Sequence, residues 1–235
     1  MYLSEKFFDW PYGEAEGTGI DFAKMLRGHE VWRHAQRRLK DNPSEFDRVD
    51  CISSLKRAVN SRLKTLDDEY GLNRLPSLRS KKQVLEKYQD YGLIRPSILK
   101  DLFEVRNLLE HGDVSPPEIE MCQYYVDIVW YFLKSTDSLL QMKCDFLQYE
   151  EGDSELFIGA DSDWNVDFNG IVEAHLLSEM PKPGFIEIVG ATVEKVKDKA
   201  NMVSVAGALK MTDELKIRFA RDYFGALGYW YEDHA

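Results

Sequence analysis

Residues 50–66 read DCISSLKRAVNSRLKTL, and their apolar side chains recur three and four positions apart. This spacing places one apolar stripe along a helix, made by Ile52, Leu55, Val59, Leu63 and Leu66. Ser44 and Glu45 are suited to begin such a helix, and Tyr70 and Gly71 are suited to end it. We therefore predict a long amphipathic helix from about residue 45 to residue 70.

Helical spacing of apolar residues extends on both sides of this stretch, from about residue 18 to residue 148. It predicts further helices at about 22–40, at about 82–91 and from Pro96 onward. A last helix has a capping signal made by Ser115, Pro116 and Glu118. Its apolar stripe runs to Leu140. Aromatic residues on more than one side of this helix indicate a partner chain, and they are Tyr124, Tyr125, Trp130, Tyr131 and Phe132.

Beyond about residue 155 the pattern changes to alternating apolar and polar residues, which is typical of strands. The predicted strands lie near 155–160, 164–177, 184–195 and 202–209. Residues 215–219 alternate in the same way, so we predict a strand there. The spacing of Leu215, Phe219, Tyr223 and Leu227 also fits a helix that begins at Thr212 or Asp213.

The two halves together predict an α+β fold, with an N-terminal α-helical bundle followed by a small antiparallel β-rich domain. We place an N-terminal extension at residues 1–19 and the helical domain at residues 20–148. The polar and acidic residues 149–155 are interpreted as a linker, and residues 156–235 as a β-rich accessory domain.

Composition limits the classes of function. The chain has 235 residues, 44% of them hydrophobic, which is enough to bury a core. A net charge of -11 argues against a protein that coats nucleic acid or membranes through bulk positive charge. Residues 24–111, however, carry 19 basic and 13 acidic side chains, so a polyanion can still bind locally to the first part of the chain.

Cysteine usage and the apolar runs bear on the cellular compartment. Cys51, Cys122 and Cys144 are odd in number and widely spaced, so neither a disulfide framework nor a zinc site is predicted. The opening residues, MYLSEKFFDWPYGE, carry acidic side chains where a secretion signal needs basic ones. The most apolar run, residues 126–133, is too short to cross a bilayer. We expect a soluble cytoplasmic protein that does not contact a membrane.

Sequence motifs for P-loop, α/β-hydrolase, zinc-protease and dinucleotide chemistry are absent. The acidic spacing from Asp161 to Asp167 is like the start of a calcium loop, but Val166 and Val172 stand where that loop needs Gly and Glu. An acidic turn between strands is the better interpretation. We predict neither a metal site nor a cofactor.

Residues 105–113, VRNLLEHGD, close one of the predicted helices. Asn107 and His111 share a helix face, whereas Arg106 and His111 diverge by about 140° around the axis. Both can reach one ligand only if His111 leaves the helical path, which Gly112 permits because glycine readily takes a positive φ. Arg and His at a helix end suit phosphate chemistry, since the guanidinium holds two phosphate oxygens and the imidazole moves a proton near neutral pH.

A purely structural explanation fits the same residues. Arg106 and Glu110 are four apart and can form a surface ion pair worth roughly a few tenths of a kcal/mol. His111 can then simply interact with the negative end of the helix. Most helix ends of this kind are structural, so the short motif by itself is compatible with either explanation.

The wider pattern resembles the HEPN superfamily of small α-helical domains. The shared features are R-N-x-x-x-H, then Gly, then a proline-opened amphipathic helix, all after the long helix of residues 50–66. The resemblance covers about residues 20–148. It implies a metal-independent endoribonuclease in which two copies of the domain place their Arg/His motifs across a shared groove.

Carried over residue by residue, the resemblance implies that Arg106 and His111 are the catalytic pair and that Asn107 orients the site. His111 would help to remove the ribose 2'-hydroxyl proton or to protonate the leaving oxygen, and Arg106 would stabilise charge on the phosphorus oxygens. The expected product is RNA with a 2',3'-cyclic phosphate end. The resemblance also implies a homodimer with an RNA substrate, a toxin or antiviral-defence role, and an antitoxin or regulatory partner protein.

Two other functions stay open. The helical domain can be a noncatalytic HEPN-like interaction module, or the β-rich domain can be the receptor of a ligand-sensing regulator. In the β-rich domain we interpret His175 as structural, because it has no nearby catalytic companion in the sequence. The C-terminal aromatic residues fit a core or a partner surface better than a base-stacking surface, and they are Tyr223, Phe224, Tyr229, Trp230 and Tyr231.

Overall fold

The computed structural model describes residues 1–20, 22–76, 84–94, 97–112 and 114–227. The predicted α+β class is confirmed, and the strand pairs are antiparallel. The chain forms two compact units. The β unit comprises Met1–Thr18, Tyr70–Ser80 and Cys144–Ala235, and the helical unit comprises Gly19–Glu69 and Lys81–Lys143.

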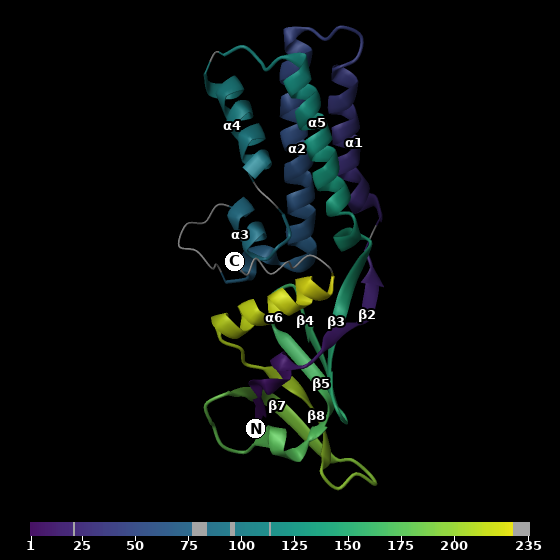
Figure 1. Cartoon of the computed structure of the whole chain (residues 1–235), viewed down its shortest axis with the longest axis vertical. Coiled ribbons are helices and arrows are strands. Elements are labelled where there is room, and N and C mark those ends of the chain that lie inside the picture. Colours follow the sequence, from purple (N-terminus) through teal and green to yellow (C-terminus); the bar gives the residue numbers. More distant parts are fainter. Residues whose placement is uncertain (21, 77–83, 95–96, 113, 228–235) are drawn as a thin grey trace. The chain divides into compact units, whose positions relative to one another are not determined.

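Long helices build the helical unit, and Figure 1 shows α1, α2 and α5 running alongside one another. Their bounds are α1 (Phe22–Arg38), α2 (Glu45–Tyr70), α3 (Val84–Asp90), α4 (Ser97–His111) and α5 (Ile119–Ser135), followed by the short 3-10 helix η3 (Ser138–Leu140). The helices predicted at about 22–40 and 45–70 are confirmed. Pro96, which was expected to open α4, lies outside the described residues.

The apolar stripe of α2 is the centre of this unit, as its spacing predicted. Its members are all buried, and they are Ile52, Leu55, Val59, Leu63 and Leu66. Gly28 of α1 lies so close to this helix and to α5 that an added Cβ would meet Leu133 Cδ2 at 2.9 Å and the Ala58 carbonyl oxygen at 3.6 Å. Close approach of the three helices therefore depends on a small residue at position 28.

The predicted start of α5 is wrong by three residues. The helix begins at Ile119 with Glu118 as its N-cap, and no side chain caps it. Pro117 follows Pro116, and a residue that precedes proline is driven out of the helical region. Ser115 and Pro116 therefore precede the helix instead of opening it. At the other end, Leu140 belongs to η3 and not to the stripe of α5.

A buried polar cluster joins α1, α2 and the segment after α5. Arg62 is 1% exposed, and its Nη2 lies 2.8 Å from Oδ1 of Asp137. His29 Nε2 lies 2.8 Å from the same oxygen. The other guanidinium nitrogen, Nη1, donates to the Leu133 carbonyl and to the Thr136 hydroxyl, each at 3.0 Å. The guanidinium thus meets a carboxylate and several oxygens in the interior of the unit.

An antiparallel sheet forms the β unit, in the strand order β2-β3-β4-β5-β8-β7-β1-β6. The strands are β1 (Tyr2–Ser4), β2 (Tyr12–Gly19), β3 (Met142–Glu151), β4 (Ser154–Ala160), β5 (Val166–Glu173), β6 (Leu177–Ser178), β7 (Phe185–Lys195) and β8 (Met202–Leu209). Strands predicted near 155–160, 184–195 and 202–209 are confirmed. The strand predicted at 164–177 is interrupted after Glu173 by the 3-10 helix η4 (Ala174–Leu176).

Two of the predicted domain limits are wrong. Residues 149–155 are not a linker, because β3 and β4 form a hairpin there in which Glu151 pairs with Ser154. Tyr149 is buried while Glu150 is exposed and pairs in register with Glu155, so these two acidic residues lie on the face opposite to Tyr149. Residues 1–19 are not an extension either, since they contain β1, the 3-10 helix η1 (Glu5–Asp9) and β2, and β1 pairs with both β6 and β7.

The strand predicted at residues 215–219 is a helix. Helix α6 (Asp213–Ala226) begins after Thr212, whose Oγ1 accepts a hydrogen bond from the Leu215 amide. In Figure 1 this yellow helix lies across strands of the sheet. The helical spacing prevailed because it buries Phe219 and Tyr223 against Trp164 at ring distances of 6.3 Å and 5.9 Å.

Candidate functional site

The three residues singled out by the sequence all lie near the C-terminal end of α4. The helix continues through His111, and the Gly112 amide donates to the Leu108 carbonyl at 2.8 Å, a bond of α-helical spacing. Gly112 does not take a positive φ, so the expected exit of His111 from the helical path is wrong. Arg106 and His111 of one chain therefore leave the helix in directions about 140° apart.

Arg106 forms an ion pair with Glu110, one turn further along α4. Its side chain is half-buried, with 26% of its surface exposed. The ion pair anticipated by the structural explanation of the motif is thus present. It also fixes the guanidinium beside the helix, because the pair restricts two long side chains to one arrangement.

Asn107 is held by a residue that the sequence did not indicate. Lys56 of α2 donates from Nζ to Oδ1 of Asn107 at 2.9 Å, and the same ammonium group lies 5.3 Å from the ring centre of Phe103. Burial and the neighbouring Arg106 guanidinium both lower the pKa of Lys56. Two cations therefore lie close together next to Asn107. Nothing in the sequence pairs positions 56 and 107, because only the packing of α2 and α4 brings them together.

His111 is highly accessible, with 80% of its side chain exposed. Its Nε2 lies 4.0 Å from a carboxylate oxygen of Glu110. The imidazole is consequently free to meet a second molecule. Such a molecule would meet the Glu110 carboxylate beside the imidazole, whereas the Arg106 guanidinium of the same chain points about 140° away around the helix axis.

Large apolar side chains are exposed on α4 and α5, the helices nearest to this group. They are Leu108, Met121, Tyr124 and Tyr131, with exposed fractions between 46% and 67%. Residues 121, 124 and 131 recur at helical spacing on α5, so they form one stripe. By contrast, Tyr125 and Phe132 are buried, so only part of the aromatic surface predicted for a partner is available.

Part of the positive charge carried by α1 is neutralised by α2. Asp50 of α2 lies 2.6 Å from Nε of Arg38 and 3.1 Å from Nε2 of His34. Next to it is a pocket of about 230 Å³, whose lining includes Arg27, His34 and Arg57. An anion entering this pocket would meet guanidinium groups from both α1 and α2.

The remaining predictions concern other parts of the chain. Asp161 lies in the turn between β4 and β5 and accepts the amides of Asp163 and Asn165, so the interpretation as an acidic turn is confirmed. Tyr223 and Phe224 are buried in the core, and residues 229–231 lie outside the described residues.

The three cysteines are free and buried, and burial is the main cause that raises the pKa of Cys51 to about 12.

Comparisons with models of known families, with curated proteins and with solved structures find no match for this chain. Within the part of the chain that the structure describes, no helix has the length and apolar character needed to cross a bilayer.

Proposed function

We propose that the chain is a metal-independent endoribonuclease of HEPN type that cleaves RNA at a site shared by two copies. The observation that carries the proposal is the accessible imidazole of His111 on the same helix end as the guanidinium of Arg106, with the ammonium of Lys56 beside it. A phosphodiester requires such a set, namely cations for its oxygens and a group that moves a proton near neutral pH.

Each residue has a distinct role in this proposal. Arg106 and Lys56 offset the negative charge that grows on the phosphorus oxygens. His111 takes the proton of the ribose 2'-hydroxyl or gives a proton to the leaving 5' oxygen, which yields a 2',3'-cyclic phosphate and a free 5' hydroxyl. Asn107 orients Lys56 through its hydrogen bond, and Glu110 holds Arg106 in place.

A second copy is needed because the helix does not bend at His111. Arg106 and His111 of one chain diverge, so the arginine of one copy must act with the histidine of the other on the same phosphate. The exposed apolar residues of α4 and α5 are suited to join the copies, since burying them removes apolar surface from water. A cytoplasmic toxin or antiviral-defence effector under the control of a partner protein fits such an activity.

The experiment compares RNA cleavage by the purified parent chain and by Arg106→Ala, His111→Ala and Lys56→Ala, in buffer that contains a chelator. Removal of a proton-transfer group lowers a rate by about 10²–10⁴-fold, so we expect a loss of at least 100-fold for His111→Ala. Lys64→Ala is the matched control, because Lys64 is an exposed cation on α2 with 73% of its side chain accessible. We expect that control to cleave like the parent.

Cleavage that persists unchanged in both Arg106→Ala and His111→Ala would contradict the proposal. The ion pair between Arg106 and Glu110 favours one alternative, a noncatalytic interaction module in which this helix end is structural. In that case the parent would not cleave RNA, and Arg106→Ala would lower the thermal midpoint by an amount matched by Glu110→Ala.

A further inference from the structure

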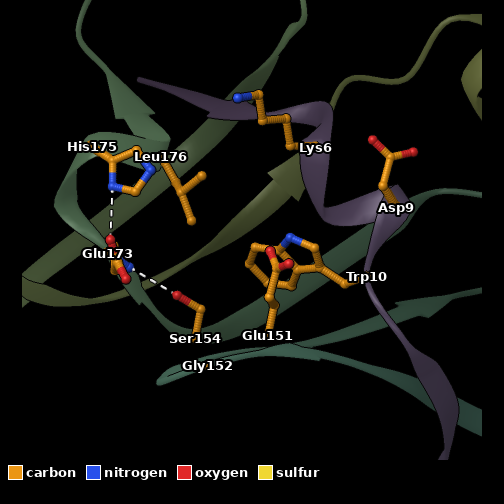
Figure 2. A pocket seen from close by; sticks show the side chains of 9 residues that line it. All are labelled: Lys6, Asp9, Trp10, Glu151, Gly152, Ser154, Glu173, His175 and Leu176. Carbon is orange, nitrogen blue, oxygen red and sulfur yellow. Dashed lines mark hydrogen bonds and ion pairs between the residues drawn. The ribbon is translucent and has the colours of Figure 1, made fainter.

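The β unit contains a pocket of about 450 Å³ that the proposed ribonuclease site does not use. Figure 2 shows its lining, which comes from the first residues of the chain, from the β3–β4 hairpin and from the segment after β5. Lys6 belongs to η1 and Trp10 follows it, Glu151 ends β3, and Glu173 ends β5. A volume of this size suits a small organic molecule.

Trp10 is the first sign that the pocket is made for a ligand. The residue is 6% exposed, and its indole lies at the centre of the lining residues in Figure 2. No described residue accepts a hydrogen bond from the indole N–H, although the nitrogen is not sealed off from the pocket. The accessible indole N–H is a hydrogen-bond donor, so it is available to a ligand in the pocket.

Charges around the pocket give the second sign. Two of its three carboxylates already have partners, since Asp9 lies 2.6 Å from Nη2 of Arg218 and Glu173 lies 2.9 Å from Nδ1 of His175. Glu151 and Lys6 have no charged partner among the described residues. The pocket therefore offers one open carboxylate, one open ammonium group and one open N–H donor.

We propose that this pocket binds a free basic amino acid, represented by L-arginine. Its cationic side chain pairs with Glu151, where the further carboxylates of Asp9 and Glu173 favour positive charge. Its α-carboxylate accepts from the Trp10 indole and from Lys6. The β unit is then a sensor of a metabolite, a function that does not depend on the ribonuclease proposal.

The test is isothermal titration calorimetry of the full chain with three probes, namely L-arginine, agmatine and L-glutamate. We expect saturable binding of L-arginine, weaker binding of agmatine because it lacks the carboxylate, and no binding of L-glutamate. Glu151→Gln should weaken L-arginine at least tenfold, since it removes the open carboxylate without changing the size of the side chain. Lys6→Gln should weaken L-arginine but leave agmatine unchanged.

Glu194→Gln on β7 is the control for a lost carboxylate outside the pocket and should bind L-arginine like the parent. Trp10→Phe tests the indole N–H, but the residue is buried and the variant has to pass a thermal-unfolding check. Lys6 and Glu151 are exposed, so those two variants decide the result even if Trp10→Phe does not fold. Absence of L-arginine binding, equal binding of L-glutamate, or parental affinity in Glu151→Gln would overturn the proposal.

Discussion

The residues of the proposed ribonuclease site and of the pocket around Trp10 come from distant parts of the chain. Arg106, Asn107 and His111 could be predicted as candidates because they stand together in one short segment at the end of a predicted helix. Lys56 cannot be picked in this way, since it reaches Asn107 only through the packing of α2 on α4. The pocket around Trp10 could not be predicted from the sequence for the same reason, because folding brings its residues together.

Asp137 is a buried carboxylate that stabilises the helical unit. Burial alone would raise the pKa of Asp137, but hydrogen bonds from His29 and Arg62 outweigh it, and the pKa lies below its usual value. We expect Asp137→Asn to lower the free energy of unfolding by about 3 kcal/mol, because it removes the negative charge of Asp137 from beside the buried Arg62 guanidinium. Urea unfolding measures this change.

The control is Asp68→Asn, which breaks an exposed pair with Lys64 and should cost about 0.5 kcal/mol or less. The stabilisation by Asp137 is present above the pKa of the unfolded aspartate, near 4, and is lost as the pH falls through the lower folded pKa. The deficit of Asp137→Asn should therefore shrink below about pH 4. A deficit no larger than that of Asp68→Asn would contradict the role given to this cluster.

Asp222 of α6 affects the pH dependence of stability in the direction opposite to Asp137. Burial raises its pKa to about 6, despite the hydrogen bond from Tyr149 and the charge of Arg218, which act in the other direction. The unfolded carboxyl loses its proton near pH 4, but the folded one keeps it until about pH 6, so this group lowers the free energy of unfolding as the pH rises between those values.

The free energy of unfolding of Asp222→Asn, relative to that of the parent, should accordingly rise by roughly 2–3 kcal/mol from pH 4 to pH 7. Chemical unfolding at both pH values measures the difference, and Asp213→Asn on the same helix controls for the loss of one negative charge. An Asp222→Asn difference that stays constant with pH would show that this carboxyl does not titrate in that range.

At the scale of elements, the long helices and the alternating strands could be predicted, and the ambiguous segments could not. The apolar stripe of α2 is buried as its spacing predicts, and buried residues alternate with exposed ones along most of β5. Residues 215–219 satisfy both patterns, and the cap at Thr212 together with the buried ring of Phe219 decides for a helix. The start of α5 depends on Pro116 and Pro117, where the second proline keeps the first out of the helix.

Gly71 ends α2 and lets the chain turn into the β unit. Its φ is +59°, and an added Cβ would collide with the backbone of Ser162 in the turn between β4 and β5. We expect Gly71→Ala to lower the free energy of unfolding by at least about 2 kcal/mol, because both the left-handed backbone and the contact are unfavourable. Gly13→Ala, which has open space around it, is the control in thermal unfolding. Equal midpoints would contradict this account.

At the scale of the molecule, the linear division into domains failed because the sheet is built from both ends of the chain. Strand β1 pairs with β7, and Leu3, Phe7 and Phe8 of the first residues are buried. Pairings between such distant segments leave no periodic trace in a single sequence. The polar and acidic composition of residues 149–155 is compatible with a linker as well as with a hairpin, and only the pairing of β3 with β4 distinguishes the two.

The central claim is that Arg106 of one copy acts with His111 of another, so the active species has to be a dimer. Sedimentation equilibrium and RNA cleavage, measured on the same samples across a dilution series, test this claim most directly. We predict that the cleavage rate per chain follows the fraction of dimer and disappears where the chain is monomeric. Full cleavage per chain in samples that sediment as monomers would contradict it.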